Sequence, residues 1–407
     1  MKGHLLMSQK EIKRMQVLDR VNQGQLTRRE AAQTLGISYR QCLRSFKRFS
    51  ARGGGGLVHK SRRRPSNRAR PPEFREKVVL RYQDRYMGFG PTLAAEKLAE
   101  DGCLLDHETL RRWLLAQGLW HKSRKRRKHR SRRERRAHFG ELVQMDGSHH
   151  RWFGADKPKA CLINMVDDAT GTSLCVMAQE ETTAACMQAL KLWIKRYGIP
   201  KELYTDRKNV FVTDRKPTIE EQLAGKEPLS AFGRVISKLG IEIIRAYSPQ
   251  AKGQVERSHG VYQDRFVKEL KLKGITTIEG ANKLLNNGFS CQLNKKFARK
   301  PQNNNNYHRP LAKSTNLDQI LCFEHTRTVT NDWTVSFEGR IFQILKTNRP
   351  LPRPKDKVIV RIHLDGRTQL IRSGRRLTYK PLKQPPHHRS LSSIAWRLHF
   401  GDAAGAG

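Results

Sequence analysis

The feature that most constrains this chain is a strongly basic run from His121 to Arg136, in which 11 of the 16 residues are Lys or Arg. A run of this kind is usually a solvated segment without structure of its own, and we expect it to become ordered only on a phosphate backbone. It also marks a boundary. Because 407 residues are too many for one ordinary core, we predict a multidomain protein.

The overall charge indicates the partner. Lys and Arg number 80 against 37 Asp and Glu, which gives a formal net charge of +43. Such an excess repels itself in isolation but releases counterions on a polyanion, so nucleic acid is the expected partner. The alternatives are a ribosomal-type RNA-binding protein and a membrane-surface protein.

The apolar runs, the N-terminal residues and the cysteines exclude several other classes of protein. No apolar run of about 18 residues is present, so we predict neither a transmembrane helix nor a membrane partner. The first residues, Met1–Ser8, lack the apolar region of a secretion signal. The seven cysteines form no Cys-x-x-Cys pair, which argues against a disulfide framework or a zinc ribbon. We expect a cytoplasmic protein associated with the bacterial nucleoid.

Residues 1–56 are predicted to form a helix-turn-helix domain. A first helix should cover Glu11–Gln23, with Ile12 and Leu18 among its inward residues. Thr27–Glu30 is a capping box for a second helix, and Ser38 caps a third, which would enter the major groove of DNA. The candidate DNA-binding residues on this third helix are Tyr39, Arg40, Gln41, Arg44 and Lys47. The alternative is an ordinary three-helix bundle.

A basic linker, flexible from the glycines at Gly53–Gly56 onward, is expected at residues 57–72. Residues 73–120 are predicted to form a second helical DNA-binding domain, of the winged-helix or helix-turn-helix kind. Asp106 should cap its last helix, on whose outer face Arg111 and Arg112 are candidate DNA contacts. Its core should contain Leu93, Leu98, Leu110, Trp113 and Leu114. A second basic linker is placed at residues 121–138.

Residues 139–310 alternate between strand-like and helical patterns. Strands are expected at 141–145, 160–166, 173–178, 202–205 and 241–245, with helices at 182–197, 233–239 and 255–270. Asp167–Gly171 resembles a hairpin turn. This order predicts an α/β layer built on a mixed sheet.

Three acids in this region are the candidate catalytic and metal-binding residues. Asp146 and Asp206 are each expected at the end of a short buried strand, and Glu256 on the first turn of a helix. Two divalent ions can activate a nucleophile, stabilise the leaving oxygen and neutralise phosphate charge, and Mg²⁺ prefers oxygen ligands. We expect Asp146 to bridge two ions, with Asp206 and Glu256 completing one shell each.

A single Asp after a strand is more often a turn former, and Asp167 and Asp168 are assigned that structural role. It is the joint placement of the three acids that favours catalysis. Around them, Arg207, Lys252 and Arg257 are predicted to contact DNA phosphates. Trp152 leaves two alternatives open, stacking on a splayed base and packing in the core.

From residue 325 to residue 382 the pattern changes to short alternating runs, such as Trp333–Phe337 and Val358–Ile362, separated by turn pairs. Runs of this length and spacing predict a small β-barrel. The remaining residues, 383–407, are polar and then small, and are predicted to be a disordered tail.

Three segments resemble the signature segments of DDE transposases with a retroviral-integrase-type core: Met145–Ser148, Thr205–Arg207 and, most specifically, Ser248–Arg257. The layout from Glu11 to Leu382 resembles bacterial insertion-sequence transposases of the ISNCY family. The resemblance implies an RNase H-like catalytic core, Mg²⁺ or Mn²⁺ as cofactor, and DNA cleavage followed by strand transfer of transposon ends. It carries the catalytic triad onto Asp146, Asp206 and Glu256.

The main hypothesis is therefore a transposase that binds the terminal inverted repeats and target of double-stranded DNA. A homodimer or larger homo-oligomer is expected, because two ends must be joined. The alternatives are a non-catalytic DNA-binding protein or repressor with a degenerate core, and a structure-specific nuclease of the same fold.

Overall fold

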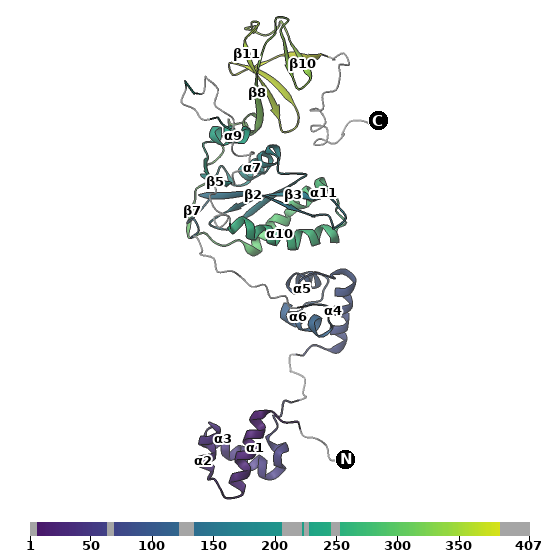
Figure 1. Cartoon of the computed structure of the whole chain (residues 1–407), viewed down its shortest axis with the longest axis vertical. Coiled ribbons are helices and arrows are strands. Elements are labelled where there is room, and N and C mark those ends of the chain that lie inside the picture. The colour runs from purple at the N-terminus through teal and green to yellow at the C-terminus, as the bar shows by residue number, and fades with distance from the viewer. Residues whose placement is uncertain are drawn as a thin grey trace. The chain divides into compact units, whose positions relative to one another are not determined.

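The computed structural model describes residues 6–62, 69–121, 134–205, 222–223, 228–245 and 253–382. The chain divides into two compact units, Met1–Trp120 and His121–Gly407. Figure 1 shows that the described part of the first unit is helical, whereas the second contains the sheets.

The first three helices follow the predicted caps. They are α1 (Gln9–Asn22), α2 (Arg28–Leu35) and α3 (Tyr39–Arg52). Thr27 and Ser38 accept hydrogen bonds from backbone amides of α2 and α3, and Gly36 closes α2 with a left-handed φ of 61°. The shared core consists of Val17, Leu18, Ala31, Ala32, Cys42 and Leu57.

Two details of this helical group differ from expectation. Ile12, predicted to face inward, is 39% exposed, while its neighbour Glu11 is buried. Glu11 accepts hydrogen bonds from the backbone amides of Ser8 and His59, which lower the pKa of its carboxyl to about 2, and it forms an ion pair with Arg62. The start of the expected linker therefore packs against α1, and the run Gly53–Leu57 is a short 3₁₀ helix, η1.

A second helical group contains α4 (Pro72–Arg85), α5 (Pro91–Glu100) and α6 (His107–Ala116). Asp106 caps α6, as predicted, by accepting from the amides of Glu108 and Thr109. Leu93, Leu98, Leu110 and Leu114 are buried, as predicted. Trp113 is only partly buried. Its ring and that of Phe74 form an edge-to-face pair with centroids 6.4 Å apart.

The second unit is built on a five-stranded sheet in the order β4-β3-β2-β5-β6. Its strands are β2 (Leu142–His150), β3 (Ala160–Asp167), β4 (Ser173–Ala178), β5 (Glu202–Thr205) and β6 (Glu242–Arg245). The pairs β2–β3 and β3–β4 are antiparallel, whereas β2–β5 and β5–β6 are parallel. This confirms the predicted mixed sheet.

Helices cover both faces of this sheet (Figure 1). One face packs on α7 (Thr183–Tyr197) and α9 (Ala231–Leu239); the other packs on α10 (Gly253–Leu272), α11 (Ile278–Leu284), the short π-helical turn η3 (Leu285–Phe289) and α12 (Ser290–Phe297). Trp152 lies fully buried in the core beside α10, where its ring meets Phe266. Core packing is therefore the role of Trp152, and the base-stacking alternative is excluded.

After α12 the chain forms β7 (Asn303–Asn306), which pairs with β1 (His138–Phe139), and then α13 (Leu317–Ile320). Seven strands follow: β8 (Cys322–Thr328), β9 (Thr334–Phe337), β10 (Arg340–Ile344), β11 (Lys357–His363), β12 (Thr368–Arg372), β13 (Arg375–Leu377) and β14 (Tyr379–Leu382). They form two open sheets, β14-β10-β9 and β13-β12-β11-β8, around one apolar core.

The expected strands of this region are confirmed, but the expected closed barrel is not formed. In residues 322–382, β8 is hydrogen-bonded only to β11 and β9 only to β10 as ladder partners, so neither sheet closes on the other. Alternation of apolar residues predicts that one face of each strand is buried, and both an open pair of sheets and a barrel satisfy that pattern.

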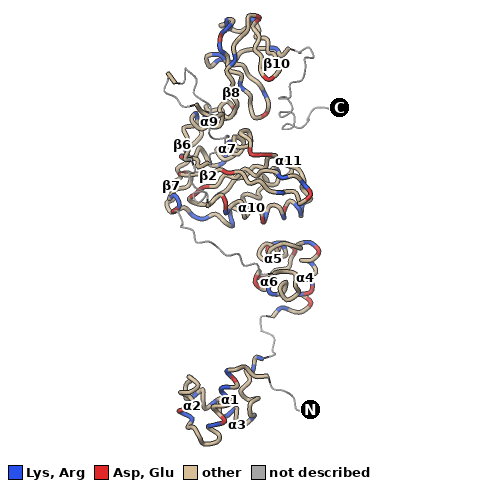
Figure 2. Tube along the Cα trace, in the orientation of Figure 1, with Lys and Arg blue, Asp and Glu red and all other residues tan. Residues whose placement is uncertain are grey.

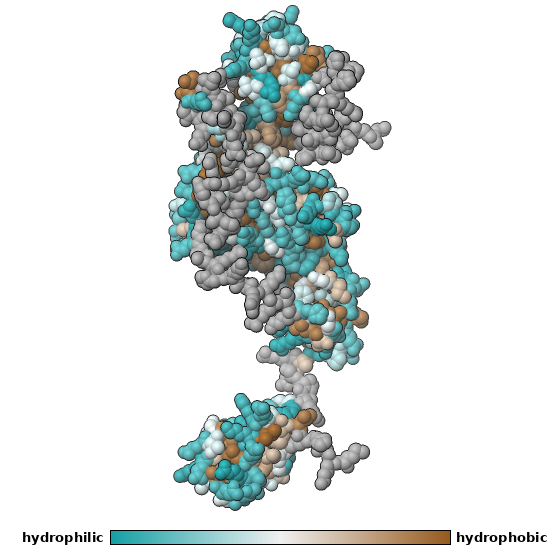
Figure 3. Space-filling model, in the orientation of Figure 1, coloured by the Kyte–Doolittle hydropathy of each residue, from teal (hydrophilic) through white to brown (hydrophobic). Residues whose placement is uncertain are grey.

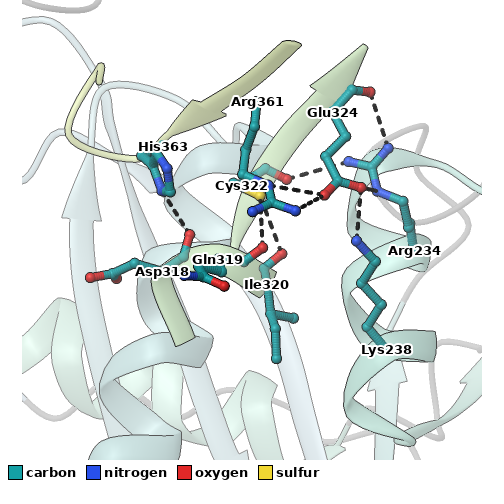
Figure 4. Close-up of polar contacts among 9 residues, drawn as sticks. All are labelled: Arg234, Lys238, Asp318, Gln319, Ile320, Cys322, Glu324, Arg361 and His363. Carbon is teal, nitrogen blue, oxygen red and sulfur yellow. Dashed lines mark hydrogen bonds and ion pairs between the residues drawn. The ribbon is translucent and has the colours of Figure 1, made fainter. Parts of the chain in front are cut away.

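Glu324 attaches this β region to the five-stranded core (Figure 4). Its carboxylate, on β8, accepts hydrogen bonds from Lys238 of α9 and Arg361 of β11, both at 2.8 Å. Arg234 of α9 donates to the carbonyl oxygens of Glu324 and Cys322. Burial acts to raise the pKa of Glu324, but the bonds from these cations outweigh it and lower the pKa.

The surface is predominantly polar. Figure 2 shows Lys and Arg along the trace of both units, and the face in Figure 3 is mostly hydrophilic with scattered apolar side chains. In the described residues, none of the helices combines the length and apolarity needed to cross a membrane.

A buried histidine ties the segment after α12 to α7. The indole Nε1 of Trp193 donates to Nε2 of His308 at 3.0 Å, and Nδ1 of His308 lies 2.8 Å from Oδ1 of Asn306. An indole nitrogen can only donate, so Nε2 must be the accepting nitrogen of a neutral imidazole. Burial lowers the pKa of His308 to about 4.

His308 should therefore make folding sensitive to acid. Between an unfolded pKa of about 6.5 and a folded pKa of about 4, the unfolded chain binds a proton that the folded chain does not, so stability falls as pH drops. In His308→Gln, which keeps an acceptor for Trp193, the loss in free energy of unfolding from pH 7 to pH 4.5 should shrink by about 2–3 kcal/mol. Urea unfolding followed by tryptophan fluorescence measures it. The exposed His149→Gln is the control, and equal pH dependence in wild type and His308→Gln would disprove the assignment.

Candidate active site

Asp146 lies in the middle of β2, not at its end as predicted. The antiparallel partner β3 continues to pair with β2 through Gly147, Ser148 and both histidines, up to the pair His150↔Ala160. Long-range pairing thus extends the strand past the glycine that suggested a turn. Asp146 is half-buried and lies opposite Asn164 of β3, so the two side chains share one face of the sheet.

Glu256 lies in the first turn of α10, as predicted, with its side chain exposed. Three hydrogen bonds fix this helix on the sheet. The amide of Val255 donates to Oε1 of Gln144 (3.2 Å), Nδ2 of Asn164 donates to Oγ of Ser258 (2.8 Å), and Nε2 of Gln263 donates to Oγ of Ser148 (3.0 Å).

These contacts show where Asp146 lies along α10. From Gln144 to Ser148 the strand advances about 13 Å, and from Val255 to Gln263 the helix advances about 12 Å. The two elements therefore run side by side, and Asp146, midway along this stretch of β2, lies beside the middle of the helical segment.

The rotation of the helix places Glu256 on that side as well. At about 100° per residue, Glu256 and Gln263 lie on the same flank of α10, the flank that faces β2. Two of the three predicted acids thus come from neighbouring elements on one side of the sheet. Both supply carboxylate oxygens, the donors that Mg²⁺ prefers.

The third acid follows β5. This strand ends at the buried Thr205 and runs parallel to β2 in the register Val143↔Leu203 and Gln144↔Tyr204. Asp206 itself, with Arg207 and Lys252, lies outside the described residues. Within the described ranges, no group of three His, Cys, Asp or Glu side chains is arranged to hold a metal ion.

The hairpin acids have the structural role predicted for them. Asp167 is fully buried and accepts from the amides of Gly140 and Thr170; burial, opposed by these bonds, raises the pKa of its carboxyl to about 6. Asp168 accepts from the amide of Arg136 and from Nε2 of Gln144 at 2.8 Å.

Gln144 and Asn164 position the site, and sequence reasoning missed both. Gln144 links Asp168 to the first turn of α10, and Asn164 accepts from the Cys175 thiol while donating to Ser258. Each interrupts an otherwise apolar strand, Leu-Val-Gln-Met and Leu-Ile-Asn-Met. A polar side chain at such a position must find hydrogen-bond partners, and that is the signal available in the sequence.

The predicted DNA-reading residues of α3 are all exposed: Tyr39, Arg40, Gln41, Arg44 and Lys47. Four of them, all but Tyr39, line one open groove together with Ser38 and Arg48. Their side chains thus form a continuous basic surface on the outer side of the three-helix group.

The outer face of α6 is less positive than expected. Arg111 donates twice to Glu108 at 2.6 Å, and Arg112 donates to the same carboxylate at 3.4 Å. The hydrogen bond from Arg111 is the main cause that lowers the pKa of Glu108 to about 2. One carboxylate thus partly neutralises both predicted DNA contacts, whose role in binding stays a prediction.

Comparisons with known proteins agree with this architecture. Residues 14–76 match the family model described as winged helix-turn helix. The chain is 36% identical over 381 residues to "Putative transposase y4bF" of Sinorhizobium fredii, covering 93% of this chain and 82% of that protein. It is 27% identical over 369 residues to the transposase for insertion sequence IS1202 of Streptococcus pneumoniae, covering 82% and 77%.

Similar solved structures include viral integrases. The HTLV-2 integrase catalytic core domain in complex with magnesium is 20% identical, with 37% of this chain and 86% of that chain covered and a TM-score of 0.28. The simian T-cell lymphotropic virus intasome, in complex with the PP2A regulatory subunit B56 gamma, is 15% identical, with 72% and 95% covered and a TM-score of 0.32.

Replacing Gln144 tests whether it holds α10 in place. Gln144→Leu keeps the volume but removes the acceptor of the Val255 amide and the Gln144 donor to Asp168, which should destabilise the second unit by about 2–4 kcal/mol. The control Gln263→Ala removes a less buried bond of the same helix and should cost about 1 kcal/mol or less. Equal effects of the two variants in chemical denaturation would contradict the role given to Gln144.

Proposed function

The chain belongs to the bacterial insertion-sequence transposases, and from that premise we propose that it cuts the ends of its element and joins them to target DNA. The observation that carries the proposal is the docking of α10 on β2, which brings Glu256 to the flank that faces β2, the strand that carries Asp146. Both acids lie on rigid elements, a strand and a helix. A site of this kind needs such rigidity because the reacting groups must be held in line.

We assign the catalytic triad to Asp146, Asp206 and Glu256. Asp146 occupies the central strand and would bridge two ions, with Glu256 holding one of them. Continuation of the β2–β5 register by two residues would bring Asp206 opposite Asp146, so Asp206 is the acid we propose to complete the other shell. This all-oxygen donor set fits Mg²⁺ or Mn²⁺.

Two such ions, when bound, lower the pKa of a water and neutralise charge on the scissile phosphate. In the proposed sequence, water first cleaves the phosphodiester bond at the element's terminus and frees a 3′-hydroxyl. That hydroxyl then attacks the phosphorus of a target phosphodiester at the same acids, and the bond to the target's own 3′-oxygen breaks as the new bond forms. No side chain needs to act as general base.

The helical groups would supply recognition. We propose that α3 enters the major groove of the terminal inverted repeats through the basic groove around Arg44, and that the α4–α6 group contacts DNA with Arg111 and Arg112. Arg207, Lys252 and Arg257 would contact DNA phosphates. Two transposon ends must be held together, so we propose that the active species is a homodimer or larger homo-oligomer. It would act in the cytoplasm, on DNA of the nucleoid.

Removing any acid of the triad should abolish chemistry but not DNA binding. Asp146→Asn, Asp206→Asn and Glu256→Gln should each lower Mg²⁺-dependent nicking and strand transfer on end-containing DNA by at least about a hundredfold. Affinity for the same DNA in EDTA should stay within about twofold. A labelled-oligonucleotide cleavage assay beside fluorescence anisotropy separates the two effects.

The control for this series is Asp264→Asn, an exposed acid farther along α10, which should nick at the wild-type rate. Undiminished strand transfer by Asp146→Asn would refute the triad. Specific end binding by the wild-type chain without any metal-dependent nicking would instead favour the alternative, a DNA-binding repressor with a degenerate core.

Arg44 tests the role of α3. Arg44→Ala should weaken binding to the inverted repeat by about 1–3 kcal/mol if the guanidinium reads a base, and less on unrelated DNA. Lys10→Ala, an exposed residue at the start of α1, is the charge-matched control. Footprinting and anisotropy on DNA flanking the gene provide the measurement. An unchanged footprint with Arg44→Ala would rule out α3 as the recognition helix.

A further inference from the structure

An arginine-lined cavity lies on the other flank of α10. It has a volume of about 210 Å³ and lies, open to solvent, between α10, α12 and the turn that joins β3 to β4. Arg135, Arg257 and Arg299 lie around it, and Val166 and Leu293 contribute apolar wall. Among the described residues, neither Asp nor Glu lines the cavity.

Helix geometry separates this cavity from the candidate acids. Gln254, Arg257 and Val261 line it at intervals of three and four residues, which marks one flank of α10. Glu256 and Gln263 lie on the opposite flank, toward β2. The cavity is thus a place distinct from the carboxylates, although it begins at the same helical turn.

No carboxylate among the described lining residues neutralises the positive charge of the cavity. Arg135 is half-buried, and its acceptors in the described structure are both uncharged: Oε1 of Gln254 and the carbonyl oxygen of Ala169. In the described part of the chain, the side chains of Arg257 and Arg299 have no hydrogen bond or ion pair.

The guanidinium groups also affect one another. Burial lowers the pKa of Arg135 most, and the charges of Arg299 and Arg257 lower it further, while Asp168 and Asp167 act in the opposite direction. Three cations that repel one another around an open cavity would be stabilised by an anion placed between them.

The chemistry favours a phosphate. Guanidinium groups match phosphate oxygens with paired donors. Phe297, which also lines the cavity, is 43% exposed and carries the guanidinium of Arg265 over its ring at 5.0 Å. Arginines beside an exposed aromatic ring are typical of surfaces that follow a nucleic-acid backbone.

We infer that this cavity is a phosphate-binding site that holds the backbone of DNA on the flank of α10 away from Asp146 and Glu256. The identity of the polyanion rests on the proposed function. Arg135 and Arg299 would contact DNA phosphates here together with Arg257. This binding of DNA by the core would require no metal.

The double variant Arg257→Gln/Arg299→Gln tests the site. In the described structure neither side chain makes a hydrogen bond or ion pair, so this variant should fold normally. Arg135 is left unchanged because its side chain makes two hydrogen bonds that stabilise the fold. Duplex DNA binding by the full chain is measured in EDTA between 50 and 200 mM salt, and the slope of log affinity against log salt should fall by about 2.

Lys271→Gln/Lys283→Gln is the charge-matched control. Both lysines are exposed and outside the cavity, and this variant should keep the wild-type slope. Equal slopes in the two double variants would overturn the inference, because the loss would then reflect net charge alone.

Chemical modification locates the contact. Phenylglyoxal should modify Arg257 and Arg299 in the free protein, and a duplex should protect both, as mass spectrometry of the peptides would show. Modification unchanged by duplex would overturn the site, and protection by inorganic phosphate without protection by duplex would overturn DNA as its ligand.

The readouts distinguish this inference from the proposed function. Slope and protection are recorded in EDTA, whereas nicking needs Mg²⁺. Protected arginines without nicking in the wild-type chain would support the phosphate site and contradict the proposed transposase chemistry. Nicking without protected arginines would support the chemistry and contradict the phosphate site.

Discussion

The structure depends most on how α10 is fixed to the central sheet. Hydrogen bonds at Val255, Ser258 and Gln263 meet polar side chains that project from β2 and β3. Apolar packing alone would hold the helix on the sheet but would tolerate sliding or rotation, because it is not directional. Directional bonds at three successive turns set both position and rotation, and these decide on which flank Glu256 lies.

The same bonds explain why polar residues stand in otherwise apolar strands. A buried amide without a partner costs about 1–3 kcal/mol. Gln144 and Asn164 are compatible with this core because α10 supplies one partner to each, while Asp168 and Cys175 supply the other. Gln144 is also bonded to Asp168, which in turn accepts from the amide of Arg136. Arg136, the last residue of the basic run, is thereby connected to the helix that carries Glu256.

The sequence predicted what local periodicity and capping determine. The caps at Thr27, Ser38 and Asp106 and the mixed strand order are confirmed, because each follows from short-range patterns. It failed where distant partners decide: β3 extends β2 beyond Gly147, and Glu11 is buried by contacts with residues nearly fifty positions away. The closed barrel failed likewise, since sheet closure depends on pairing between strands and not on their pattern. The sequence identified Asp146 and Glu256 as candidate acids, but it did not predict the hydrogen bonds that fix α10 on the sheet.

Adjacent residues of α10 face different chemistry. Glu256 and Arg257 are neighbours in sequence, yet a helix turns about 100° between them, and the structure gives Arg257 no ion pair among the described residues. An arginine close enough to pair with a carboxylate would compete with a metal for the same oxygens. Turning Arg257 toward the cavity leaves its positive charge for an anion, on the flank opposite the one where Asp146 and Glu256 would take a cation. The docking bonds of α10 would therefore serve both proposed sites at once, because any rotation of the helix that moved the acids would move the arginine with them.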